Sequence, residues 1–74
     1  MTTQIIREMT PVDSLELAAI GYRNSNLVIQ FHHGRTYEYF QIPYAEYEAL
    51  LNSNDRANRF HNNIDGLFAC KRIA

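Results

Sequence analysis

One segment predicts a β-hairpin: Phe31-His-His-Gly-Arg-Thr-Tyr-Glu-Tyr-Phe40. Gly34 supplies the positive φ that a tight loop between two strands needs. Because the side chains of a strand alternate between its two faces, Tyr37 and Tyr39 share one face. The two rings either fill a core, with Thr36 and Glu38 facing solvent, or lie exposed as platforms on which nucleic-acid bases stack. The burial of these rings therefore decides between a structural and a functional role.

The segments around this hairpin predict an α+β fold. Residues 17–22 and 27–31 place alternate apolar side chains on one face, as half-buried strands do, and residues 36–41 form a third strand. After them the apolar spacing changes to three and four residues, which predicts one helix over residues 44–51 and a second over residues 55–63. The expected architecture is a three-stranded antiparallel meander followed by two short helices packed on one face, in the order β-β-β-α-α.

The length of the chain limits it to one domain, because 74 residues can enclose only a single small core. We expect residues 1–10 to form a flexible N-terminal tail, since they show no apolar period, and residues 11–74 to form the single domain. One cysteine excludes an intramolecular disulfide. The sequence has no signal-peptide core and no apolar run of the ~18 residues that a membrane span needs, so a cytoplasmic protein without membrane contact is expected.

Charge is nearly balanced overall but unevenly distributed. Seven lysine and arginine residues stand against eight acidic residues, which gives a formal net charge of −1. The concentrated positive charge lies in the last third of the chain, on Arg56, Arg59, Lys71 and Arg72. Arg56 and Arg59 are expected on the exposed side of the second helix, and Phe68 is an apolar residue close by. These cations form either a solvated surface or an anchor for an acidic protein segment or a few phosphates.

No catalytic or cofactor-binding constellation is predicted. Cys70 lies near the C-terminus beside no glycine-rich or oxyanion-forming sequence, which favours an incidental thiol over a nucleophile. His32, His33, His61 and Cys70 could each ligate zinc, yet their spacing matches no paired zinc motif. The three glycines stand too far apart for a phosphate-binding loop. We therefore expect a protein without enzymatic activity, metal or cofactor.

Five segments of the chain have a joint order and spacing that is moderately specific. They are Pro11-Val-Asp-Ser-Leu-Glu-Leu-Ala-Ala-Ile-Gly-Tyr22, Leu27-x-Ile-x-Phe31-x-x-Gly34-x-x-Tyr37-x-Tyr39-Phe40-x-x-Pro43, Tyr47-x-x-Leu50-Leu51, Phe60-x-x-x-Ile64-x-Gly66 and Lys71-Arg72-Ile73. Together they resemble the KTSC domain, a small domain that occurs at the C-terminus of some lysyl-tRNA synthetases and alone in bacterial and phage proteins. The resemblance spans about residues 11–73, and the central Tyr-x-Tyr of the family corresponds to Tyr37 and Tyr39.

The synthetase context of the family implies RNA binding, but this chain departs from the family pattern where RNA binding needs positive charge. Family members tend to be basic around the second helix, where this chain has Asn58, Asn62 and Asp65, and Glu38 stands where a basic residue is common. We therefore expect a small binding module that docks onto a protein of the transcription or translation machinery, for example RNA polymerase or a tRNA synthetase, and regulates it. The alternative is a weak RNA-binding module that uses Tyr37, Tyr39 and the C-terminal basic residues.

Overall fold

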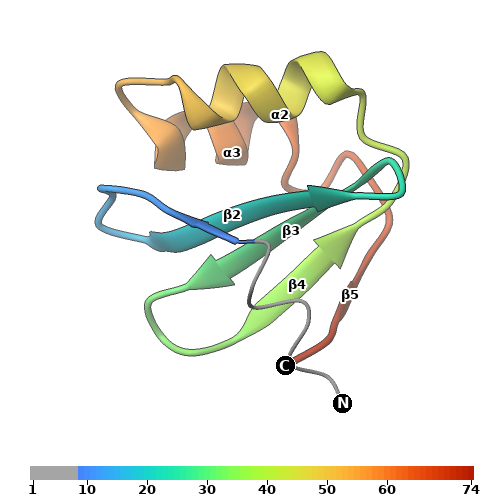
Figure 1. Cartoon of the computed structure of the whole chain (residues 1–74), viewed down its shortest axis with the longest axis horizontal. Coiled ribbons are helices and arrows are strands. Elements are labelled where there is room, and N and C mark those ends of the chain that lie inside the picture. Colours follow the sequence, from blue (N-terminus) through green and yellow to red (C-terminus); the bar gives the residue numbers. More distant parts are fainter. Residues whose placement is uncertain (1–8) are drawn as a thin grey trace.

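The computed structural model describes residues 9–74, which form an antiparallel sheet with two helices over one face (Figure 1). The strands follow one another across the sheet in chain order: β1 (Thr10–Pro11), β2 (Leu17–Arg23), β3 (Asn26–Phe31), β4 (Thr36–Tyr39) and β5 (Cys70–Arg72). Helices α2 (Tyr44–Leu51) and α3 (Arg56–Asn63) lie between β4 and β5 in the chain. The predicted α+β class, the antiparallel sheet and the two helices are confirmed.

Two short edge strands extend the three strands that the sequence predicted. Thr10 of β1 pairs with Ile20, and Lys71 of β5 pairs with Glu38. Strands of two and three residues are too short to show an alternating pattern, so their pairing is set by the neighbouring strand and not by their own sequence. Residues 1–8 of the predicted N-terminal tail lie outside the described residues, and Thr10, at its end, already belongs to the sheet.

Local sequence signals fix the connections between the elements. Asn24 and Ser25 adopt φ values of 51° and 67°, the left-handed conformation that a two-residue hairpin turn requires. Gly34 has φ 102° in the next turn, as predicted. Asp55 caps α3, because its Oδ1 accepts a hydrogen bond of 3.3 Å from the backbone N–H of Asn58. These turns fold the chain back on itself and bring both helices onto the same face of the sheet.

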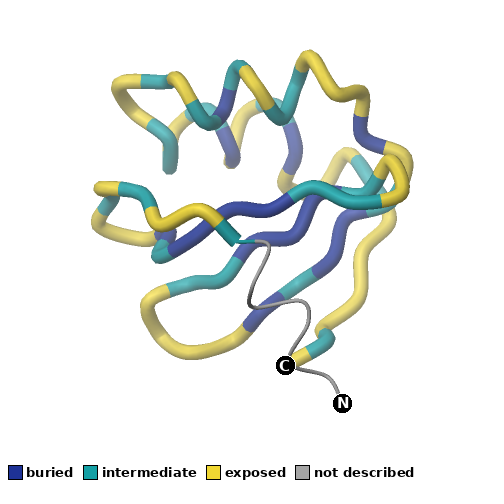
Figure 2. The backbone as a smooth tube through the Cα atoms, viewed as in Figure 1, coloured by how far each residue is buried: buried dark blue, intermediate teal, exposed yellow. Residues whose placement is uncertain are grey.

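The core lies between that face and the helices (Figure 2). The sheet contributes Leu17, Ile20, Leu27, Ile29 and Tyr39, and the helical half of the molecule contributes Ile42, Leu50, Phe60 and Ile64. Phe60 of α3 is central to this layer, since its ring centroid lies 5.5 Å from that of Tyr39 and 5.6 Å from that of Phe31, both in edge-on geometry. One aromatic residue thereby joins α3 to β3 and β4.

The exposure of the side chains on the opposite face of β4 differs from the prediction. Thr36 and Glu38 were expected to face solvent, but they are only 2% and 6% exposed. Val28, which pairs with Glu38 on the same face of the sheet, is also buried, and β4 has a neighbouring strand on each side. The Glu38 carboxylate accepts a hydrogen bond of 3.0 Å from Asn26 Nδ2 and lies 3.7 Å from Arg23 Nε, so its charge is compensated.

Replacing Tyr39 tests this core directly. Tyr39→Ala removes a ring that is 5% exposed, and we expect it to lower the free energy of unfolding by about 3–5 kcal/mol, as for other buried aromatic residues. The same change at Tyr44, which is 55% exposed, should cost less than about 1 kcal/mol. Urea unfolding of both variants measures the difference. A similar stability for the two variants would contradict the burial of Tyr39.

Candidate functional site

The Tyr-x-Tyr strand faces the helices and not solvent. Tyr39 lies in the core, and Tyr37 is half-buried, with its ring 6.1 Å from Phe31 and 6.5 Å from Tyr39. Burial raises the pKa of the Tyr39 phenol well above its ordinary value, with smaller contributions from Cys70 and Asp65. Of the two roles that the sequence left open, Tyr39 has the structural one, because a ring packed against Phe60 cannot stack on a base.

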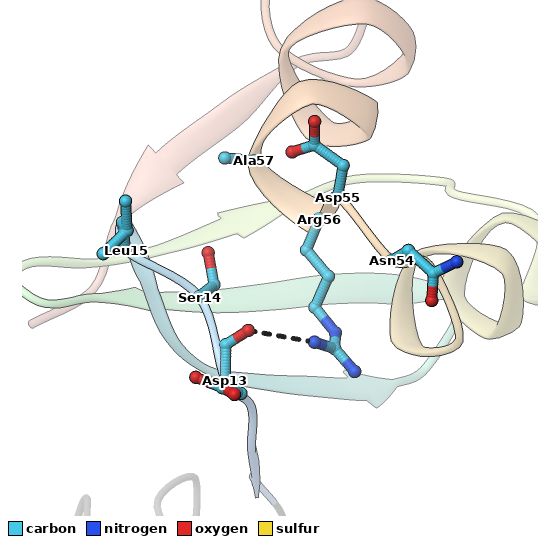
Figure 3. A pocket seen from close by; sticks show the side chains of 7 residues that line it. All are labelled: Asp13, Ser14, Leu15, Asn54, Asp55, Arg56 and Ala57. Atoms are coloured by element: carbon cyan, nitrogen blue, oxygen red, sulfur yellow. Dashed lines mark hydrogen bonds between the residues drawn. The ribbon is translucent and has the colours of Figure 1, made fainter.

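The guanidinium group of Arg56 forms hydrogen bonds with backbone groups of other segments (Figure 3). Its Nε and Nη2 donate hydrogen bonds of 3.2 and 2.8 Å to the carbonyl oxygen of Leu51, and its Nη1 donates one of 3.2 Å to the carbonyl oxygen of Asp13. Leu51 ends α2, where backbone carbonyls have no partner within the helix. Arg56 therefore supplies hydrogen-bond donors to a free carbonyl at the end of α2 and links this helix end to the segment before β2.

Arg59 is also engaged within the fold. Its Nη2 lies 2.8 Å from Oε1 of Glu46, and its Nε donates to the same oxygen at 3.2 Å, so the pair links α3 to α2. Arg56 and Arg59 were expected on the exposed side of the helix, but both are only partly exposed. Both guanidinium groups have partners in other elements, which periodicity along a single helix does not reveal.

Truncating Arg56 should therefore destabilise the fold. Arg56→Met keeps the aliphatic stem but leaves the carbonyls of Leu51 and Asp13 without this donor, and we expect a loss of about 1–2 kcal/mol. The exposed Arg35 provides the control, since Arg35→Met should change stability by less than about 0.5 kcal/mol. Thermal and urea unfolding measure both variants. Equal stability of Arg56→Met and the wild type would show that these hydrogen bonds do not stabilise the fold.

A turn before β2 is held by several of these contacts. The Ser14 hydroxyl accepts hydrogen bonds of 3.3 Å from the backbone N–H groups of Glu16 and Leu17, and His32 Nε2 lies 2.9 Å from the carbonyl oxygen of Ser14. Leu15 at its tip is 99% exposed. Beside it lies a hollow of about 310 Å³ between this turn and the start of α3 (Figure 3). The turn thus displays one apolar side chain at a fixed position.

His61 connects α3 to the same turn. Its Nδ1 lies 3.0 Å from Oδ2 of Asp65, and its Nε2 lies 2.9 Å from Oε1 of Glu16. The hydrogen bond with Asp65, followed by that with Glu16, raises the pKa of the His61 imidazole above its ordinary value. A neutral imidazole carries one N–H and donates to one carboxylate, whereas the protonated ring donates to both.

This contact predicts a pH dependence of stability. Because folding raises the pKa of His61, its contribution is complete below the unfolded value of about 6.5 and is lost as the pH rises through the folded pKa. The side chain is 46% exposed, so the effect should be only about 0.5 kcal/mol. Urea unfolding of the wild type and His61→Gln at about pH 5.5 and 8.5 measures it. A difference between the two proteins that does not shrink at the higher pH would contradict this account.

The remaining predicted residues lie at the far edge of the sheet. Lys71 and Arg72 are exposed on β5, and Phe68, just before that strand, is half-buried against the core. Arg35 lies at the same edge. Its neighbour Thr36 donates a backbone hydrogen bond of 3.0 Å to the carbonyl oxygen of Ala74, which brings residue 35 close to the C-terminal residues. We call Arg35, Lys71 and Arg72 the basic edge. Arg35 was not among the residues predicted from the sequence, because only the pairing of β4 with β5 brings it near the C-terminal residues.

A cluster of three tyrosines forms a second surface, which we call the tyrosine surface: Tyr22, Tyr44 and Tyr47. The ring of Tyr22 is stacked on that of Tyr47 at 5.1 Å and meets that of Tyr44 edge-on at 5.3 Å. The Tyr22 hydroxyl donates a hydrogen bond of 2.6 Å to the carbonyl oxygen of Ile42, which fixes its ring. Tyr44 is the first residue of α2, lies beyond the core and is 55% exposed.

The tyrosine surface borders a shallow hollow of about 500 Å³. Tyr22, Ser25, Gln41, Ile42, Pro43 and Tyr44 line it. The turn between β2 and β3 and the start of α2 meet at this end of the molecule (Figure 1). The hollow therefore offers aromatic and apolar contact together with polar groups at its margin, a composition that suits binding of another molecule.

Within residues 9–74 no group of three or more histidine, cysteine, aspartate or glutamate side chains is arranged to hold a metal ion. None of the helices in the same range has the length and apolar character needed to cross a membrane.

A model of the KTSC domain family matches residues 13–68. The chain belongs to this family. A crystal structure of a KTSC domain protein from Yersinia pestis is similar to it, with a TM-score of 0.84 and 32% sequence identity, over 89% of this chain and 96% of the other. No curated protein matches the chain. The match covers β2, β3, β4 and both helices, so the tyrosine surface is part of the KTSC domain itself.

Proposed function

We propose that this KTSC domain is a non-enzymatic, cytoplasmic binding module that docks onto a protein of the transcription or translation machinery and regulates it. RNA polymerase and tRNA synthetases are the examples that the family context suggests. The observation that carries the proposal is the tyrosine surface: three rings held against one another beside a shallow hollow, with one of them more than half exposed.

The composition of this surface supports a protein partner. Tyrosine is enriched in protein interfaces because it offers a large contact area at a low entropic cost and a hydroxyl for hydrogen bonding. Here Tyr22 and Tyr47 restrain each other by stacking, so little further ordering is needed when Tyr44 meets a partner. Glu48 is exposed on α2, and Glu46 is ion-paired with Arg59, so no unpaired cation of α2 is available there for a phosphate backbone.

Replacing Tyr44 tests the proposal. We expect Tyr44→Ala to weaken partner binding at least ~10-fold, about 1.4 kcal/mol, without unfolding the domain. Leu67→Ala is the matched control, because Leu67 is 65% exposed but does not line the hollow. Affinity capture from cell lysate, with and without nuclease, followed by titration of the purified partner, measures the effect.

Three outcomes would contradict this account. Capture that is lost after nuclease treatment would favour RNA over a protein partner. Normal binding by Tyr44→Ala together with weak binding by Leu67→Ala would assign docking to another surface. Turnover of a substrate by the purified domain would contradict a non-enzymatic role.

RNA binding remains the second candidate because the basic edge gathers Arg35, Lys71 and Arg72. With three cations, the slope of log affinity against log salt concentration should be near about −2 on single-stranded RNA, and we expect no dissociation constant below ~10 μM at physiological salt. Fluorescence anisotropy with labelled single-stranded RNA at several salt concentrations measures both quantities. A sub-micromolar affinity that disappears in Lys71→Gln with Arg72→Gln would establish RNA as the ligand.

A further inference from the structure

The sheet has an outer edge at β5 that no strand covers within residues 9–74. In the strand order β1-β2-β3-β4-β5, the two ends are β1 and β5. β1 has only two residues, one of them Pro11, which lacks a backbone N–H. All three residues of β5 are exposed, and this strand runs along one margin of the sheet (Figure 1). β5 is therefore the edge with unused hydrogen-bonding capacity.

The backbone pairing of β5 identifies the groups that point outward. The N–H of Ile73 donates to the carbonyl oxygen of Thr36 at 2.8 Å, and the N–H of Phe40 donates to that of Ala69 at 2.9 Å. Positions 69 and 73 thus direct their backbone groups toward β4, and by the alternation of an antiparallel ladder position 71 does the same. The N–H and C=O groups of Cys70 and Arg72 then point away from the sheet.

Charge determines which strand this edge can accept. Lys71 and Arg72 lie on opposite faces of β5, and Arg35 precedes the neighbouring strand. None of these three side chains forms an ion pair with another residue of the described range. Antiparallel pairing with a second copy of this chain, in the register that joins Cys70 to Arg72, would place Lys71 opposite Lys71, which is unfavourable. Positive side chains on an edge discourage self-association in this way, but they do not repel an acidic segment.

We propose that β5 accepts an extended acidic segment of a partner protein as an additional strand. The backbone of that segment bonds to the outward groups of Cys70 and Arg72, and its carboxylates lie beside the basic edge. RNA could satisfy the cations, but its backbone has no donor and acceptor pattern that matches a strand edge. The inference rests on the proposed protein-docking function and adds to it a second contact, separate from the tyrosine surface.

Amide hydrogen exchange tests strand addition on the wild-type protein. The probe is a capped ten-residue peptide with three central glutamates flanked by alternating valine and threonine, and a ten-nucleotide polyuridine serves as the comparison. With saturating peptide, NMR should show exchange of the Cys70 and Arg72 amides slowed at least ~10-fold, and little further protection of the Lys71 amide, which already faces β4. Peptide binding without protection of these two amides would overturn the inference, as would no binding at ~1 mM. Protection by polyuridine and not by the peptide would assign the edge to RNA.

A pair of variants isolates the backbone contribution. Cys70→Pro removes one outward N–H without changing charge, and proline is tolerated at such a position of an edge strand. We expect it to weaken peptide binding at least ~10-fold, whereas Cys70→Ala keeps the N–H and binds normally. Equal affinity of the two variants would overturn strand addition. If Cys70→Pro does not fold, the exchange experiment on the wild type decides alone.

The two proposals can fail separately. The peptide experiment contains no partner protein, so lack of protection at β5 overturns strand addition and leaves the tyrosine surface untouched. Conversely, partner binding that is insensitive to Tyr44→Ala overturns docking through the tyrosine surface, whatever the peptide does at β5.

Discussion

The structure depends on the contact that Phe60 makes with Phe31 and Tyr39. These three rings come from α3, β3 and β4, and they meet edge-on with centroids 5.5 and 5.6 Å apart. Aromatic pairs in this geometry add to the stabilisation that burial alone provides. Because the helices follow β4 directly in the chain, packing Phe60 on Tyr39 also determines which face of the sheet they cover. That face, and with it the Tyr-x-Tyr strand, becomes the core.

The packing of the core determines which side chains remain available on the surface for binding. The ring that could have stacked on a base, Tyr39, is used for folding, and the guanidinium groups of Arg56 and Arg59 bind a helix end and a glutamate. Two other features stay accessible. One is the tyrosine surface, and the other is the basic edge at β5. Both features match ways in which proteins contact other proteins, through preordered aromatic anchors and through strand addition.

The sequence predicted those parts of the fold that short-range patterns encode. The central strands, both helices and the Gly34 turn follow from periodicity and turn chemistry, whereas the sequence left open whether Tyr39 is buried. The short strands β1 and β5 do not follow from these patterns, because their pairing comes from neighbours distant in the chain. The burial of Glu38 was also missed, because its partners Asn26 and Arg23 lie 12 or more positions away in the chain. Arg56 has backbone carbonyls as partners, one of them 43 positions away, and a carbonyl leaves no signature in the sequence.

The accessibility of the five tyrosines tests the central claim most directly, namely that the family's Tyr-x-Tyr strand serves the core and the tyrosine surface faces solvent. Photochemically induced nuclear polarisation of the free protein reports each ring separately. The account predicts a strong signal from Tyr44, weaker signals from the half-buried rings and none from Tyr39, which is 5% exposed. A strong signal from Tyr39, or none from Tyr44, would contradict it.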